Sequence, residues 1–82
     1  MELTKGEAVI FLEHYDLFDV DMKDREVMFY KYTSEDKCLV RCPDTGEWAE
    51  PKISFLKQKK PGHIPKEYAK VCETIKQMAI TY

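Results

Sequence analysis

The sequence lacks several features that most enzymes and membrane proteins need. Its 82 residues include only three glycines, which excludes a glycine-rich loop that wraps around phosphate groups. The two serines, Ser34 and Ser54, lie outside any glycine-rich elbow that presents a serine nucleophile. No apolar run approaches about 18 residues, and the first residues do not show the charged and then apolar pattern of a secretory signal. We therefore expect a cytoplasmic protein that is not an enzyme.

Cysteine is also scarce, and the spacing of the three cysteines disfavours a disulfide or a metal site. Cys38 and Cys42 fall in one predicted strand, where residues four apart lie about 13 Å from each other. A disulfide needs Cα atoms within about 7 Å, and zinc binds each sulfur at about 2.3 Å. His63 and Cys72 would have to complete a zinc site from distant segments. We expect no metal and no cofactor, and we interpret the cysteines as small buried residues of a reduced protein.

The residues that are present are typical of one small globular domain spanning residues 1–82. Hydrophobic residues make up 44% of the chain and charged residues 34%, a balance that favours a folded over a disordered chain. A chain of this length buries only about 60–65% of its unfolded surface, so its core is small. Five tyrosines, four phenylalanines and one tryptophan are enough to fill such a core and to leave aromatic side chains for an interface.

Charge is divided unequally along the sequence. Residues 1–50 carry thirteen acidic and six basic side chains, and residues 51–82 carry seven lysines and two glutamates. The two parts therefore have net charges of −7 and +5, although the whole chain has a net charge of only −2. Such an asymmetry is typical of a surface that attracts a charged partner. The excess of acid and the absence of arginine after Arg41 favour a protein over a nucleic acid as that partner.

An amphipathic helix is predicted near the N-terminus. Thr4 and Glu7 have the spacing of a capping box, which marks the start of a helix. At about 100° per residue, one apolar stripe follows, made of Ala8, Phe11, Leu12, Tyr15 and Phe18. Ile10 and Leu17 fall on the opposite side of this helix. That second apolar side is available to a partner, or to a second copy of the chain in a homodimer.

Three strands and a second helix are predicted after an acidic loop. The strands, rich in β-branched and aromatic residues, cover residues 27–33, 37–42 and 47–56. Pro43 to Gly46 has the composition of a turn, and Pro51 places the third strand at an edge or a bulge. The second helix starts near Pro65, and its apolar stripe contains Tyr68, Val71, Cys72, Ile75, Met78, Ala79 and Tyr82. We expect an α+β fold with the order α-β-β-β-α, in which a three-stranded antiparallel meander sheet carries both helices on one face.

Two helices on one face would leave bulky side chains exposed on the other face of the sheet. Exposed apolar area marks interfaces, and Tyr and Trp are favoured anchors there. Acidic groups around such anchors would speed encounter with a basic partner surface. The predicted partner-binding residues are Tyr30, Tyr32, Trp48, Ile10, Leu17, Asp19, Asp21 and Asp24, with Glu26, Glu35 and Asp36 as further acids at the rim. We interpret the protein as an inhibitor or modulator of a protein partner, similar in type to the accessory proteins of phages and mobile elements.

The lysine-rich part of the chain supports an alternative function. The start of the second helix has free backbone N–H groups that favour anions, and five lysines lie around it: Lys57, Lys59, Lys60, Lys66 and Lys70. With these lysines, the order α-β-β-β-α resembles the double-stranded-RNA-binding domain over nearly the whole chain. The resemblance implies that Lys59, Lys60, Lys66 and Lys70 contact phosphates across a groove of RNA. A nucleic acid or a phosphate-containing ligand is therefore the alternative partner.

Overall fold

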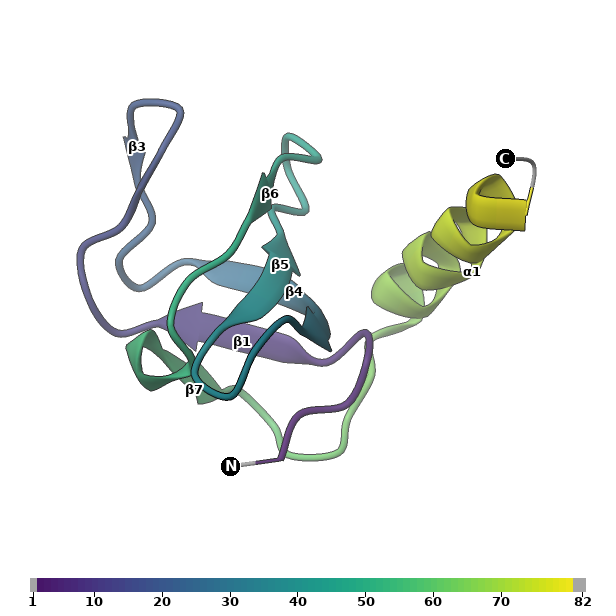
Figure 1. The fold of residues 1–82 in the computed structure, drawn as a ribbon, viewed down its shortest axis with the longest axis horizontal. Coiled ribbons are helices and arrows are strands. Elements are labelled where there is room, and N and C mark those ends of the chain that lie inside the picture. The colour runs from purple at the N-terminus through teal and green to yellow at the C-terminus, as the bar shows by residue number, and fades with distance from the viewer. Residues whose placement is uncertain (1, 81–82) are drawn as a thin grey trace.

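The protein folds around an antiparallel sheet that carries a helix on one face (Figure 1). The computed structural model describes the backbone of residues 2–80 and the side chains of residues 2–76. Within this range the strands are β1 (Ala8–Phe11), β2 (Asp16–Leu17), β3 (Val20–Asp21), β4 (Glu26–Tyr32), β5 (Cys38–Arg41), β6 (Trp48–Ala49) and β7 (Leu56–Gln58), with a 3₁₀ turn η1 (Ile53–Phe55) and a helix α1 (Lys66–Ile80). Five strands form one sheet in the order β6-β5-β4-β1-β7, and β2 and β3 form a separate hairpin.

The predicted α-β-β-β-α meander with two helices on one face is wrong. The described residues contain one helix, and the sheet has five strands instead of three. The topology of the double-stranded-RNA-binding domain is therefore absent, and so is the N-terminal helix whose second side was predicted to pair in a homodimer. Two local differences produce this result: the predicted first helix is a strand, and the predicted third strand is divided into two.

Residues 8–11 form an interior strand, β1, because both of its faces are covered. Val9 is paired with Val27 of β4 on one side and with Gln58 of β7 on the other. The side chains of Val9 and Phe11 are fully buried in the core, whereas Ala8 lies under α1. A strand buried on both faces has a continuous apolar sequence, and such a run lacks the alternation that distinguishes a strand from a buried helix.

The predicted capping box is a turn that directs a carboxylate into the protein. The Glu7 N–H donates to the Thr4 carbonyl at 2.9 Å, and Gly6 between them has a φ of +92°. The Glu7 side chain is only 1% exposed. Its carboxylate accepts hydrogen bonds from Gln58 Nε2 at 2.7 Å and from the Gly62 N–H at 3.2 Å. Glu7 therefore connects the start of β1 to β7 and to the loop that leads into α1.

The predicted third strand, residues 47–56, is interrupted at Pro51. Strand β6 ends at Ala49, and the chain then passes through η1 before β7 begins at Leu56. Pro51 is buried and has no N–H to donate, but its carbonyl accepts a hydrogen bond from the Cys38 N–H at 3.1 Å. The interruption lets β6 pair at one edge of the sheet and β7 at the opposite edge, next to β1.

The two faces of the sheet hold separate apolar clusters. The larger cluster fills one face with residues from the five strands of the sheet, together with Leu3 and Met22. The smaller cluster lies on the other face, where Ala8 and Met28 pack against Tyr68 of α1. Tyr30 faces the helix on the same side as Met28, as simple alternation predicts. A β-bulge in β4 between Phe29 and Lys31 then shifts the alternation, so Tyr32 packs against Phe29 and not beside Tyr30.

Helix α1 begins directly after Pro65, as predicted. Its first turns pack on the sheet through Tyr68, Val71, Cys72 and Ile75, and the helix then extends beyond the sheet (Figure 1). The other predicted members of this stripe, Met78, Ala79 and Tyr82, lie outside the described side chains. Within residues 2–80, no helix is both long enough and apolar enough to cross a membrane.

Candidate protein-docking surface

The β2–β3 hairpin projects from the body of the protein (Figure 1). It carries an exposed aromatic side chain, Phe18, at its tip. Phe18 and Asp19 form the two-residue turn, with φ values of +47° and +65°. Two positive φ values are typical of a type I′ turn, for which Asn-Gly is the favoured sequence. A phenylalanine in this region is unusual because its Cβ crowds the backbone. Phe18 is nevertheless 72% exposed, so burial in the core does not compensate for the strained backbone.

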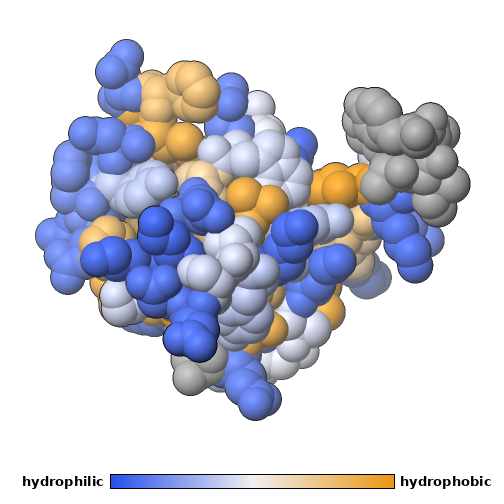
Figure 2. Space-filling model, in the orientation of Figure 1, coloured by the Kyte–Doolittle hydropathy of each residue, from blue (hydrophilic) through white to orange (hydrophobic). Residues whose placement is uncertain are grey.

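A small apolar groove separates this hairpin from the turn between β5 and β6. Its volume is about 210 Å³, and it is lined by Leu17, Phe18, Val20, Met22, Arg25, Cys42, Asp44, Thr45 and Glu47. The buried side chains of Met22 and Cys42 form its floor, and Val20 at its edge is 39% exposed. Figure 2 shows an apolar patch at this end of the molecule, bordered by hydrophilic residues. A groove of this size is smaller than a typical small-molecule pocket and suits a single apolar side chain.

Acidic side chains surround the groove. Asp44 and Glu47 line it from the β5–β6 turn, and Asp19 lies at the hairpin tip beside Phe18. Arg25 is the one cationic side chain among the lining residues. The structure thus brings together four predicted partner-binding residues, Leu17, Asp19, Asp21 and Asp24, within the hairpin and the turn that follows it.

A histidine connects the two strands at the base of the hairpin. His14 Nε2 lies 3.1 Å from Asp16 Oδ1, and His14 Nδ1 lies 3.1 Å from Asp21 Oδ1. Hydrogen bonds to Asp21 and then Asp16, with the charges of both carboxylates, raise the pKa of His14 above its ordinary 6.5. The pKa of Asp21 is lowered, first by the backbone N–H of Lys23 and then by His14. His14 thus contacts a carboxylate on each strand of the hairpin.

The groove also contains a cysteine with an altered thiol. Burial alone would raise the pKa of Cys42. Hydrogen bonds from the Thr45 side chain and from the backbone N–H groups of Thr45 and Asp44 lower it by a larger amount, so the net pKa is below the ordinary value. By contrast, burial and the nearby charge of Glu50 raise the pKa of Cys38 to about 11. All three cysteines have free thiols. Within the described residues, no group of three or more His, Cys, Asp or Glu side chains is arranged to hold a metal ion.

The predicted aromatic anchors do not lie with this hairpin. Tyr30 is half-buried under α1, with its ring edge against Trp48 at 5.3 Å and Lys5 Nζ 4.5 Å from its centre. Tyr32 packs edge-on against Phe29 at 5.0 Å, and its hydroxyl accepts a hydrogen bond from the Leu3 N–H at 2.8 Å. Tyr32 and Trp48 are 43% and 38% exposed, but their aromatic partners lie on different faces of the sheet.

The remaining apolar anchor was predicted on a helix and is found on a strand. Ile10 is half-buried on β1, where it is paired with Lys57 of β7. Of the eight predicted partner-binding residues, four therefore lie in or just after the hairpin, and the other four lie at separate places on the five-stranded sheet. Only the group in and after the hairpin is associated with an apolar groove that acids surround.

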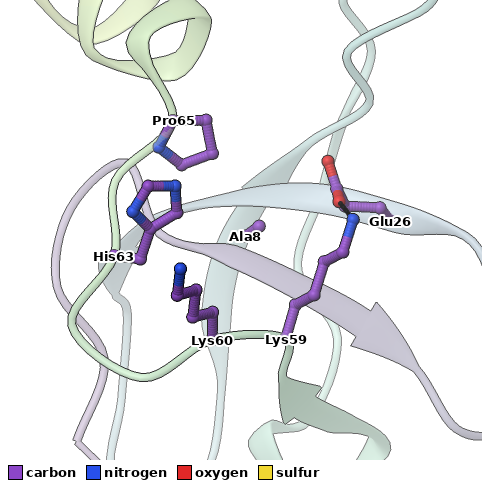
Figure 3. A pocket seen from close by; sticks show the side chains of 6 residues that line it. All are labelled: Ala8, Glu26, Lys59, Lys60, His63 and Pro65. Carbon is purple, nitrogen blue, oxygen red and sulfur yellow. Dashed lines mark hydrogen bonds and ion pairs between the residues drawn. The ribbon is translucent and has the colours of Figure 1, made fainter.

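Two of the five predicted lysines, Lys59 and Lys60, line a second cavity at the start of α1 (Figure 3). This cavity has a volume of about 330 Å³ and is lined by Ala8, Glu26, Lys59, Lys60, His63 and Pro65. Lys59 Nζ forms an ion pair with Glu26 at 2.7 Å, and the Tyr68 hydroxyl donates to the same carboxylate. Lys60 extends toward His63 in Figure 3. Lys57, Lys66 and Lys70 are exposed but do not line the cavity.

In this second cavity, Lys59 and Glu26 already have partners within the protein. Burial alone would raise the pKa of Glu26. The hydrogen bonds from Lys59 and Tyr68 and the charge of Lys59 together lower it by a larger amount, so the net pKa lies below its ordinary 4.5. Burial and then the neighbouring Glu26 raise the pKa of Tyr68. A bound anion would have to compete with Glu26 for Lys59, which leaves Lys60 and His63 as the available cationic or polar side chains.

Phe18, Val20 and Met22 are the main site residues that the sequence did not assign to an interface. Phe18 was predicted to belong to a helical stripe, whereas the structure places it at the hairpin tip. From Asp16 to Asp21, acidic residues alternate with Leu17 and Val20 around a central Phe-Asp pair. Two short half-exposed strands with a tight turn produce this pattern, and it could have indicated the hairpin.

Comparison of the chain with protein-family models, curated proteins and solved structures finds no match. The functional interpretation of this surface therefore depends on its own geometry and charge.

Proposed function

We propose that the protein is a non-enzymatic protein-binding module, which docks its hairpin and the adjacent groove onto a basic partner surface and thereby inhibits or modulates that partner. The main support is Phe18, a 72%-exposed aromatic side chain in a strained turn beside an apolar groove. Strained residues persist where the surrounding structure holds them, and they concentrate at functional sites. An interface that covers Phe18 would bury an aromatic anchor of the type that dominates binding energy.

The acids around the groove define the partner chemistry of this proposal. In a protein partner, a Lys or Arg side chain would meet Asp19, Asp44 or Glu47, while an apolar side chain enters the groove. Charges at the rim of such an interface mainly increase the association rate, and added salt weakens this effect. The proposed interface thus combines an apolar centre with a charged rim, which is the usual anatomy of a protein–protein interface.

The test is affinity capture from the native lysate with tagged wild-type protein and with a Phe18→Ser, Val20→Ser variant, each with and without nuclease. We expect a protein partner that survives nuclease and is lost with the hairpin variant. Leu12→Ser is the matched control, because Leu12 is also an exposed apolar residue but does not line the groove. Equal recovery of the partner by the hairpin variant and the wild type would contradict the proposal.

A second candidate function rests on the cavity beside α1. Lys60 and His63 line this cavity without a side-chain hydrogen bond or ion pair within residues 2–76, so both are free to meet a phosphate group (Figure 3). Phosphate binding predicts that affinity for a 20-nucleotide RNA or DNA falls steeply between about 50 and 200 mM salt. Fluorescence anisotropy with wild-type protein and a Lys57→Glu, Lys60→Glu variant measures this. Equal binding by both proteins would exclude the lysine surface.

A further inference from the structure

The hairpin is too small to be held by its own strands alone. Each strand has two residues, and isolated two-stranded hairpins are marginally stable even when longer. Its turn is also strained at Phe18. Additional support comes from the body of the protein, where the Met22 N–H donates to the Tyr15 carbonyl at 2.8 Å and the Tyr15 ring stacks on Phe11 at 5.1 Å.

Two like charges oppose each other across this hairpin. Asp16 of β2 and Asp21 of β3 are direct cross-strand partners. Like charges at directly opposite positions destabilise a strand pair. The hairpin therefore carries an unfavourable pair at its base unless a cation lies between the carboxylates.

His14 occupies that position, and its two contacts define its protonation state. Both ring nitrogens lie 3.1 Å from a carboxylate oxygen, one on each strand. A carboxylate only accepts hydrogen bonds, and a neutral imidazole has a single N–H donor. Both contacts are hydrogen bonds only when the ring is a doubly protonated imidazolium.

The charged groups around His14 come from three segments. Asp16 belongs to β2 and Asp21 to β3, and Glu13 precedes His14 in the chain. Lys23 follows β3 and contributes its backbone N–H to Asp21 at 3.0 Å. The ring and both carboxylates are exposed, so protons exchange freely with solvent.

We propose that His14 is a proton-operated clip, which closes the β2–β3 hairpin when it is protonated and releases the two opposed carboxylates when it is not. The clip thereby controls how Phe18 and the groove are presented. Its effect on partner binding rests on the proposed function, whereas its effect on the hairpin of the free protein does not.

The pH range follows from the directions of the two pKa shifts. The pKa of His14 is raised, so its contribution is complete below about pH 6.5 and is lost as the pH rises through the raised value. The pKa of Asp21 is lowered, so its contribution is present above about 3.8 and is lost only as the pH falls through the lowered value. The clip is therefore closed in mildly acidic solution and opens as the pH rises through the raised pKa of His14.

The test measures hairpin closure in the free protein by NMR at pH 5.5 and pH 8.5. The methyl groups of Leu17 and Val20, which are cross-strand partners, give a nuclear Overhauser effect that reports closure. The buried partners Val9 and Val27 provide an internal reference. We expect the ratio of the two signals to fall by about twofold or more at the higher pH, in line with the modest strength of exposed ion pairs.

Variants separate the clip from other effects of pH. In His14→Gln the ratio should be low and independent of pH, and in His63→Gln it should change as in the wild type. A wild-type ratio that stays constant while the His14 ring titrates would overturn the proposal, as would an equal pH response in His14→Gln. Because no partner is present, the result is independent of whether the hairpin is a docking surface.

Discussion

The two ends of this molecule use their charges in different ways. At the helix end, Glu26 accepts from both Lys59 and Tyr68, and the buried Glu7 accepts from Gln58 and the Gly62 N–H. At the hairpin end, acids surround an exposed Phe18 and an apolar groove, with Arg25 as the one cation lining that groove. The helix end therefore uses polar groups to hold the fold together, whereas in our proposal the acids beside the groove meet an external partner.

This difference separates structural from functional roles for residues of the same type. A carboxylate with internal donors on each oxygen, such as Glu7, contributes to stability and has little capacity for a ligand. Carboxylates around a groove contribute little to stability because exposed ion pairs are weak. We expect substitutions at the helix end to change the free energy of unfolding and substitutions at the hairpin end to change binding.

The largest expected effect is that of Glu7→Ala. Removal of this buried carboxylate takes the acceptor from the Gly62 N–H and one of the two acceptors from the Gln58 side-chain amide. We expect the free energy of unfolding to fall by about 3 kcal/mol. For a domain of this size the melting temperature would fall by about 15 °C. Calorimetry of Glu7→Ala beside the exposed control Glu2→Ala measures this. A loss for Glu7→Ala no larger than for the control would show that the Glu7 contacts do not support the fold.

A smaller loss of stability is expected from Tyr68→Phe. This change removes the hydroxyl that donates to Glu26, which lowers the free energy of unfolding by about 1 kcal/mol. Because the pKa of Glu26 is lowered, this contribution should be complete above about pH 4.5 and disappear as the pH falls through the lowered value. A double-mutant cycle of Tyr68→Phe with Glu26→Gln in urea measures the coupling. Strict additivity of the two losses would disprove the interaction.

Phe18→Asn is expected to raise the free energy of unfolding, in contrast to the two preceding variants. Asparagine tolerates positive φ better than phenylalanine, and Phe18 contributes little burial, so stability should rise by about 0.5–1 kcal/mol. Partner binding should be lost in the same variant. Urea denaturation with Val20→Asn as the control, where the backbone is an ordinary strand, separates the two effects. Destabilisation by Phe18→Asn would mean that the phenylalanine supports the fold.

The smallest perturbation is alkylation of the cysteines. Cys42 lines the groove and has a lowered pKa, whereas Cys38 is fully buried with a pKa of about 11. Iodoacetamide at pH 8 should therefore modify Cys42 at least about tenfold faster than Cys38, as followed by peptide mass spectrometry. Bound partner should slow only the reaction at Cys42. Equal rates at the two cysteines would show that the groove does not give solvent access to Cys42.

Local patterns in the sequence predicted two of the strands, one turn and the start of the helix, although the overall fold was predicted wrongly. Strand β4, strand β5, the turn at Pro43–Gly46 and the start of α1 after Pro65 were each predicted within a few residues. In each case a nearby signal, such as β-branched residues or a proline, determines the local structure. The predicted N-terminal helix was wrong because β1 is buried on both faces, and its apolar run is compatible with either a helix or a strand until its neighbours are known.

The candidate site was predicted only in part, for a related reason. The acidity of residues 1–50 was visible in the sequence, and Leu17, Asp19 and Asp21 were chosen from it as candidate interface residues, Leu17 on a helix that the structure replaces with β2. The exposure of Phe18 was not, because it depends on a tight turn that normally requires Asn or Gly. The β4 bulge was equally hidden, and it places Tyr30 and Tyr32 in different environments although simple alternation predicts one face.

The central claim is that the hairpin end, and not the lysine end, meets the partner. Hydrogen–deuterium exchange of the protein alone and bound to the captured partner tests this most directly. Slower exchange in residues 13–22 and 43–47, with unchanged exchange in residues 57–66, is the predicted result. Slower exchange confined to residues 57–66 and the first turns of α1 would contradict the account and assign binding to the lysine surface.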